Sequence, residues 1–232
     1  MGDFLVKLVL LPGMDGTGAL FEPLLNCLPS TIETTVIPLP QSGPQDYGSL
    51  AIHVRAPLPN EPFFLLAESF SGPIAAALDQ CPDMQVRGLV FAASFIEPIR
   101  HPLLPLAKLL PLSALMSLPL SQLALKHFML GHNGPRSDIA RFANVVRSVP
   151  SSCLRARLGT VSSFPPVGYA SDTPSLYLRA TGDRLIDASA SDAFASTYQN
   201  LIVKDIDGPH FVLQAKPQQC AGEILAFMGA TL

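Results

Sequence analysis

Short apolar runs alternate with amphipathic segments along most of the 232 residues of the chain. Several of the runs are apolar at nearly every position, which is typical of strands that are buried on both faces of a parallel sheet. The pattern predicts six strands, at Phe4–Leu11, Glu33–Leu39, Pro62–Ala67, Val86–Ala93, Ser175–Thr181 and Leu201–Ile206.

Helical spacing of apolar residues occupies most of the stretches between these runs. The expected helices are Ala19–Leu28, Tyr47–Ala56, Pro73–Gln80, Ala188–Tyr198 and Gln218–Met228. Strands that alternate with helices are typical of a doubly wound α/β domain with right-handed crossovers. We therefore expect a compact, mainly parallel sheet of about six strands with helices on both faces.

One segment of about eighty residues, between the fourth and fifth runs, lacks a strand pattern. Its first part is rich in leucine, and four prolines divide it into short helices: Pro102, Pro105, Pro111 and Pro119. Its second part, Ser137–Leu158, has helical spacing. We expect residues 1–96 and 172–232 to form the core and residues 97–171 to form a helical lid over an apolar pocket. Extra core helices are the alternative for this segment.

The charge balance argues against a polyanionic partner. Charged residues make up 14% of the chain, the net charge is -3, and no basic run is present. Nucleic-acid binding is therefore not expected. The four cysteines are widely spread, without a C-x-x-C pair, which indicates free thiols in a reducing compartment: Cys27, Cys81, Cys153 and Cys220.

The N-terminal residues lack the basic region and the small-residue cleavage site of a signal peptide. The charge-free stretch Leu109–Leu125 contains prolines and polar residues, which makes it a poor transmembrane helix. We expect a soluble, cytoplasmic protein without an integral membrane span.

A candidate nucleophile lies where the third expected strand meets a helix. The residues Ala67-Glu68-Ser69-Phe70-Ser71 match the pattern small-x-Ser-x-small, and a nucleophile elbow requires this strand-to-helix context. Ser69 is the favoured nucleophile, because Ser71 would lie deeper in the helix and has Pro73 as a neighbour. The alternative is that Ser69 only caps the helix.

A serine nucleophile needs a base and an orienting carboxylate, in the chain order Ser, acid, His for this topology. Asp183 follows the fifth expected strand and His210 follows the sixth, so both lie at strand ends where active sites of parallel sheets form. Asp187 and Glu97 compete for the role of the acid. Asp187 has the position of a helix N-cap, and Glu97 follows the preceding strand.

The loop after the first expected strand, LPGMDGTG, is glycine-rich and precedes a helix. It lacks the Gly-Lys-Ser/Thr ending of a phosphate loop, and its glycine spacing does not match a dinucleotide fingerprint. An oxyanion hole requires backbone N–H groups aimed at developing negative charge. We expect the N–H groups of Met14 and Phe70 to form this donor pair.

The order of these motifs resembles the α/β-hydrolase fold, starting at the strand that this family counts as its third, over nearly the whole chain. The motifs LPGMDGTG and ESFSG are similar to those of a bacterial and plant group of esterase, lipase and thioesterase-like hydrolases. Ala67 and Ser71 stand where that group usually has glycines, and both are small enough for the elbow to form.

The triad predicts a serine hydrolase that cleaves small-molecule carboxylic esters with an apolar acyl group. An acyl-thioesterase or acyltransferase, with acyl-carrier protein or CoA as partner, is the first alternative, because the same triad serves it. A non-catalytic small-ligand receptor on the same fold is the second. We expect no metal or organic cofactor, because no cluster of histidines and cysteines has ligand spacing.

Overall fold

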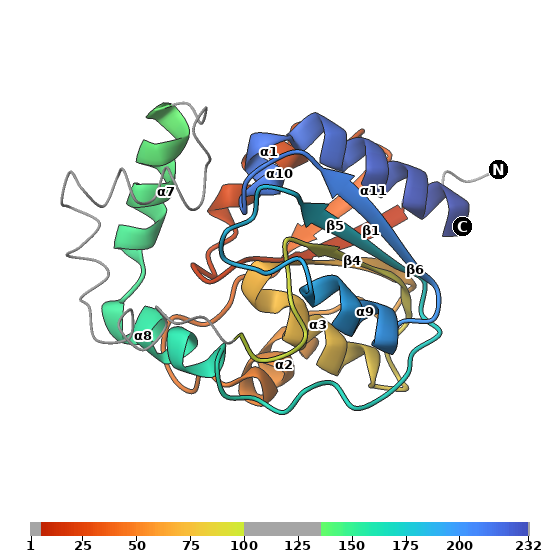
Figure 1. Ribbon diagram of the computed structural model, residues 1–232, viewed down its shortest axis with the longest axis horizontal. Helices are drawn as coiled ribbons and strands as arrows, with labels where there is room; N and C mark the ends of the chain where they lie inside the picture. The colour runs from red at the N-terminus through yellow and green to blue at the C-terminus, as the bar shows by residue number, and fades with distance from the viewer. Residues whose placement is uncertain (1–5, 100–135, 232) are drawn as a thin grey trace.

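The computed structural model describes residues 6–99 and 136–231. Six parallel strands form one sheet in the order β2-β1-β3-β4-β5-β6 (Figure 1). The strands are β1 (Val6–Leu11), β2 (Ile32–Val36), β3 (Phe63–Glu68), β4 (Val86–Ala92), β5 (Ser175–Ala180) and β6 (Leu201–Ile206). The predicted parallel sheet of about six strands is confirmed.

Helices lie on both faces of the sheet, as the alternating pattern predicts (Figure 1). The helices are α1 (Glu22–Leu25), α2 (Tyr47–Arg55), α3 (Gly72–Asp79), α7 (Arg136–Ser148), α8 (Ser151–Thr160), α9 (Ala190–Thr197), α10 (Val212–Ala215) and α11 (Pro217–Thr231). Two short 3₁₀ turns, η1 (Ala19–Phe21) and η2 (Ser69–Ser71), precede α1 and α3.

Alternate residues of a strand point to opposite faces of the sheet, so each central strand contributes to two apolar layers. On one face, Leu65 and Phe91 pack in a buried cluster with α2, α3 and α9. On the other face, Leu66 and Val90 pack with α1, α10 and α11. Burial on both faces explains why the sequence of β3 is apolar at nearly every position.

Two helical boundaries differ from the sequence-based expectation. The segment Ala19–Leu28 contains a 3₁₀ turn and a single α-helical turn rather than one helix, and Pro23 lies at the start of that turn. A proline is compatible with the first turn of a helix but cannot continue a helix that has already begun. The C-terminal helix α11 is longer than predicted, and the short α10 precedes it.

Helices α7 and α8 occupy the second half of the segment predicted as a lid (Figure 1). A buried cluster joins them to the core, with Phe142 and Val146 of α7 and Leu154 of α8 against Leu20 and Phe211. The leucine-rich first half, including Leu109–Leu125, lies outside the described residues. Among the helices that are described, none is long and apolar enough to cross a membrane. The division into core and lid stays a prediction.

Candidate active site

Ser69 lies at a sharp turn between β3 and α3. Its φ is 47°, in the left-handed region that a residue with a side chain rarely adopts, so the turn is strained. A Cβ on Gly72 would lie 2.3 Å from both the Phe95 carbonyl oxygen and Ser94 Oγ, so glycine permits the close approach of α3 to the end of β4. Ser94 Oγ also donates to the Ser69 carbonyl oxygen at 2.7 Å, which fixes the turn.

The structure brings the three predicted triad residues into one hydrogen-bonded chain. Ser69 Oγ lies 2.9 Å from His210 Nε2, and His210 Nδ1 lies 2.7 Å from Asp183 Oδ2. The second carboxylate oxygen of Asp183 accepts from the backbone N–H groups of Leu185 and Ile186, at 2.8 and 3.0 Å. The side chains of His210 and Asp183 are buried, so the imidazole is held between the serine and a fixed carboxylate.

The rival residues lie elsewhere. Ser71 is buried and its hydroxyl donates to the Pro12 carbonyl oxygen at 2.5 Å, and not to an imidazole. No side-chain cap bond holds the start of η2 or α3, so the helix-capping alternative for Ser69 finds no support in the hydrogen bonds. Asp187 accepts from the Ser189 N–H just before α9, and Glu97 is exposed.

The charges around His210 favour its protonated form. Burial disfavours the imidazolium, but the charge of Asp183, its hydrogen bond and the charge of Glu68 outweigh this effect, so the pKa of His210 is raised. A raised pKa makes His210 a stronger base toward the Ser69 hydroxyl.

The loop after β1 passes directly beside the nucleophile. A Cβ on Gly13 would lie 3.8 Å from Ser69 Cβ. The Gly16 N–H donates to the Gly13 carbonyl oxygen at 3.0 Å, which closes a tight turn around Met14, and Gly16 supplies the positive φ of 71°. Met14 and Phe70 are thus on the two segments that flank Ser69, where an oxyanion hole would form.

Sequence reasoning missed a buried carboxylate beneath this loop and the amide that binds it. Glu68 is 3% exposed, and burial raises the pKa of its carboxyl to about 7. Gln214 Nε2 donates to Glu68 Oε1 at 2.8 Å. The signal that was available is the glutamate in the ESFS stretch, because a charged residue between a buried strand and a helix needs a partner.

Sequence reasoning also missed Arg157 and Gln45. Arg157 belongs to α8, is fully buried, and donates to the carbonyl oxygen of Met14 in the loop beside the nucleophile. Gln45 is buried before α2 and accepts from Arg157 Nε at 2.9 Å. Asp183 and His210 were identified because active-site residues of parallel sheets follow the ends of strands. Neither Arg157 nor Gln45 directly follows a strand, so the same reasoning could not identify them.

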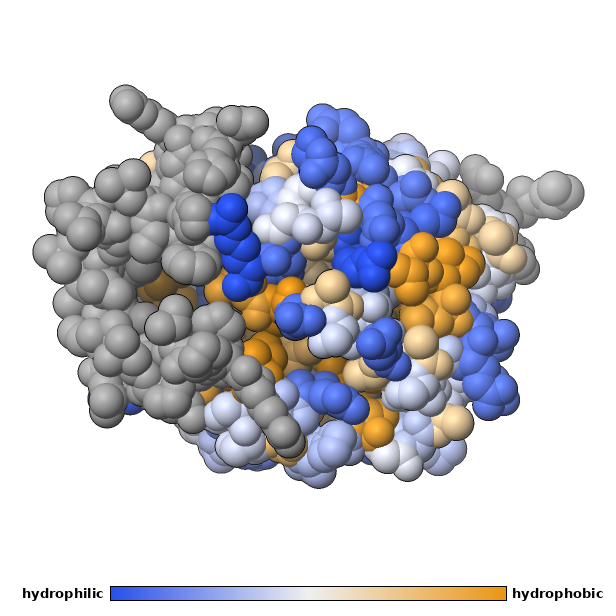
Figure 2. Space-filling model, in the orientation of Figure 1, coloured by the Kyte–Doolittle hydropathy of each residue, from blue (hydrophilic) through white to orange (hydrophobic). Residues whose placement is uncertain are grey.

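Two cavities lie close to these elements. A cavity of about 1150 Å³ reaches Asp183 and lies against the loops after β4 and β5. Its walls are partly apolar, with Phe95 and Ile186, and partly polar, with Glu97 and Asp187. On the face shown in Figure 2, apolar surface gathers near the middle and again toward the right, over β6, where Ile202 and Val203 are exposed.

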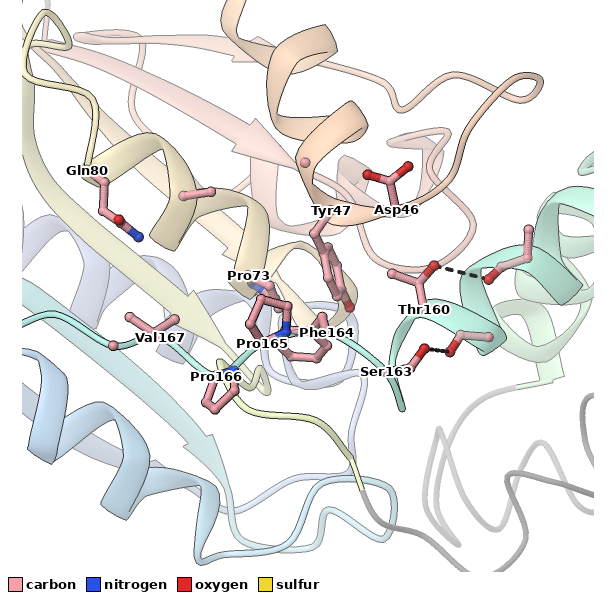
Figure 3. Close-up of a pocket in the computed structure, with 15 residues that line it drawn as sticks. Asp46, Tyr47, Pro73, Gln80, Thr160, Ser163, Phe164, Pro165, Pro166 and Val167 are labelled. Carbon is pink, nitrogen blue, oxygen red and sulfur yellow. Dashed lines mark hydrogen bonds between the residues drawn. The ribbon is translucent and has the colours of Figure 1, made fainter.

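The second cavity, of about 770 Å³, lies between α2, α3 and the segment that follows α8 (Figure 3). Tyr47, Pro73 and Phe164 line it, and none of the triad residues does. The Tyr47 ring packs against Phe70 at 5.0 Å and against Phe164 at 4.7 Å between ring centroids. Of these two cavities, only the first has a triad residue, Asp183, in its lining. Within residues 6–99 and 136–231, no group of three or more His, Cys, Asp and Glu side chains could hold a metal ion.

Comparison with known proteins gives structural matches only. No protein-family model and no curated protein sequence matches the chain. An esterase from Exiguobacterium antarcticum aligns over 97% of this chain and 92% of its own, with a TM-score of 0.79 at 14% identity. A membrane phospholipase A described as a bacterial virulence factor aligns over 97% and 79%, with a TM-score of 0.78 at 19% identity. An enol-lactonase from Burkholderia xenovorans LB400 aligns over 97% and 91%, with a TM-score of 0.76 at 11% identity.

These matches cover nearly the whole chain, including all six strands of the sheet. The chain therefore has the α/β-hydrolase fold, as the resemblance of its motifs implied.

Proposed function

We propose that the protein is a serine hydrolase that cleaves carboxylic esters with an apolar acyl group. The observation that carries this proposal is the hydrogen-bonded chain from Ser69 through His210 to Asp183. The fold alone is compatible with many activities, so the proposal rests on this site and not on the structural matches.

In the proposed first step, Ser69 Oγ forms a bond to the ester carbonyl carbon while His210 Nε2 takes the hydroxyl proton. Asp183 holds the imidazole and stabilises the imidazolium. The tetrahedral oxyanion accepts from the N–H groups of Met14 and Phe70, each donor contributing about 3 kcal/mol. The carbon–oxygen bond to the leaving alcohol then breaks, and His210 returns the proton to that alcohol.

The second step releases the acyl group. Water attacks the acyl-enzyme carbonyl, His210 accepts a proton from it, and a second oxyanion occupies the same two donors. Collapse of this intermediate breaks the bond to Ser69 Oγ, which regains its proton. The products are the free acid and the unchanged enzyme, and no step requires a cofactor.

The apolar acyl group is inferred from the cavity that reaches Asp183. Phe95, Ile96 and Ile186 form apolar parts of its wall, against which a hydrocarbon chain would pack. Glu97 and Asp187 form polar parts of the same wall, where the more polar end of a substrate would lie. A thioester would meet the same triad, so acyl-thioesterase or acyl-transfer activity is the first alternative. A small-ligand receptor with an inactive triad is the second.

The test is hydrolysis of p-nitrophenyl esters, from acetate to laurate, by the purified full-length protein. We expect turnover, and we expect Ser69→Ala to lower kcat by about 1000-fold or more with the fold retained. A fluorophosphonate should label the wild-type protein at Ser69, as peptide mass spectrometry would show.

Ser71→Ala is the matched control, because it removes a hydroxyl two residues away that binds Pro12 instead of His210. This variant should keep the fluorophosphonate label and most of its activity. Loss of activity in Ser71→Ala with full activity in Ser69→Ala would refute the choice of nucleophile. Absence of turnover across the panel, with tight binding of an apolar ester, would favour the receptor. Faster cleavage of matched acyl-CoA thioesters would favour the thioesterase.

A further inference from the structure

Helix α8 carries an arginine that is directed into the core beside the nucleophile. The Arg157 side chain is 0% exposed. Its Nη1 donates to the Met14 carbonyl oxygen at 2.7 Å, its Nη2 to the Pro40 carbonyl oxygen at 2.9 Å, and its Nε to Gln45 Oε1 at 2.9 Å. All three guanidinium nitrogens therefore bind protein groups, which is the condition for burying a cation.

The acceptors of Arg157 are themselves fixed. The amide nitrogen of Gln45 donates to the carbonyl oxygens of Pro40, Ser42 and Gly43, at 3.1 to 3.2 Å, so this side chain cannot rotate freely. The planar guanidinium matches three acceptors at fixed positions, and a lysine ammonium cannot reproduce that geometry. Arg157 thus has one well-defined place in the core.

The contact with Met14 fixes the loop that is expected to stabilise the oxyanion. In a trans peptide the C=O and N–H point in opposite directions, so the bond from Gly16 N–H to the Gly13 carbonyl directs the Met14 N–H away from the turn. Arg157 holds the next peptide of the same turn through the Met14 carbonyl. Together the two bonds fix both peptide planes that include Met14.

The guanidinium also contacts the second expected donor residue. Its central carbon lies 5.8 Å from the centroid of the Phe70 ring, within the range of a cation–π contact. Gly16 makes room for it, because a Cβ at that position would lie 2.3 Å from Arg157 Nη1. One buried side chain therefore touches both Met14 and Phe70, which flank the nucleophile.

We propose that Arg157 is a positioning residue that presets the two oxyanion donors, so that α8 and the loop after β1 form one rigid unit with the nucleophile elbow. This inference rests on the proposed function. Donors that are in place before reaction stabilise the transition state without reorganisation, and small displacements of them reduce the rate strongly. Loss of this contact should therefore lower kcat and leave substrate binding largely unchanged.

The test compares Arg157→Lys with Arg155→Lys in the full chain. Arg155 is an exposed residue two positions earlier on α8, so it receives the same change without touching the core. We expect Arg157→Lys to lower kcat for a p-nitrophenyl ester by about 10- to 100-fold, with KM within about twofold. The affinity for a trifluoromethyl ketone, whose adduct with the nucleophile carries an oxyanion, should fall by the same factor. Arg155→Lys should match the wild type in all three quantities.

A folded Arg157→Lys variant with wild-type kcat, or one whose loss lies entirely in KM with unchanged trifluoromethyl-ketone affinity, would overturn the inference. If Arg157→Lys does not fold, Gly16→Ala displaces the guanidinium while keeping the arginine, and wild-type kcat in that variant would overturn it too. An inactive wild-type protein refutes the proposed function, and the inference with it. An active wild type with an equally active Arg157→Lys refutes only the inference.

Discussion

At the scale of single residues, Glu68 adds a second carboxylate to the candidate site. It is buried beside the nucleophile, and its charge is one of the causes that raise the pKa of His210. Gln214 donates to it, and so does the Gly13 N–H, which belongs to the loop beside Ser69. Glu68 therefore connects the basicity of the imidazole with the loop that is expected to bind the oxyanion.

Replacing Glu68 with glutamine should move the acid limb of the pH profile of kcat/KM to lower pH. The limb reports protonation of His210 in the free enzyme, because only the neutral imidazole can accept the Ser69 proton. Removing the negative charge of Glu68 destabilises the imidazolium, so the pKa of His210 falls and the active form persists to lower pH. The measurement is kcat/KM for a p-nitrophenyl ester as a function of pH.

Glu61→Gln serves as the control for this profile, since Glu61 is exposed and pairs with Lys7 at 2.8 Å, at the opposite end of β3. Its acid limb should coincide with that of the wild type. An unchanged acid limb in Glu68→Gln, or a shift to higher pH, would contradict the electrostatic role given to Glu68.

The residues that sequence reasoning identified share one property, a place at a strand end. Ser69, Asp183 and His210 each follow a segment that the sequence predicts as a strand, so their common edge of the sheet can be inferred without coordinates. Arg157 has no such marker. An arginine in a helix normally faces solvent. The three oxygen atoms that allow Arg157 to be buried belong to loops distant in sequence, whose path the sequence does not reveal.

At the scale of elements, the strands could be predicted more closely than the helices. A central strand is buried on both faces and is therefore apolar at nearly every position, as Phe63–Glu68 shows. Such a run can be recognised in the sequence. Helix ends depend on local bonds that apolar spacing does not encode. The segment Ala19–Leu28 shows this, because Gly18 has a φ of 77° and the only α-helical turn there begins at Glu22, with Pro23 as its second residue.

The packing of α7 on the core gives a prediction at this scale. Phe142 of α7 is 7% exposed, and its ring lies 4.7 Å from that of Phe211, the residue after His210. Phe142→Ala should lower the free energy of unfolding by about 3 kcal/mol, because it leaves a cavity in this cluster. Urea denaturation measures the loss. Ile52→Ala, at a position 76% exposed, should change the free energy of unfolding by less than about 0.5 kcal/mol, and an equal effect of both variants would contradict the packing role.

At the scale of the whole molecule, two buried titratable groups with a raised pKa lie together at the carboxyl ends of the strands. Glu68 and His210 are both nearly fully buried there, and both have a pKa above the ordinary value. The carboxylates with a lowered pKa, such as Asp46 and Asp205, are exposed groups whose titration lies below pH 4. Glu68 and His210 therefore contribute to the dependence of stability on pH near neutrality.

The folded protein should become less stable as the pH rises from 5 to 8. Glu68 has a pKa of about 7 in the folded chain and 4.5 as its ordinary value, so the folded state binds more protons in this window. The stability that this group contributes is fully present below pH 4.5 and is lost as the pH rises through about 7, a change on the order of 3 kcal/mol. His210 acts in the same direction, because its pKa is raised above 6.5.

Urea denaturation at several pH values should therefore show a free energy of unfolding that falls as the pH rises in the wild type. Glu68→Gln should flatten the curve and Glu61→Gln should not, and a curve for Glu68→Gln parallel to that of the wild type would show that the Glu68 carboxyl is not the titrating group.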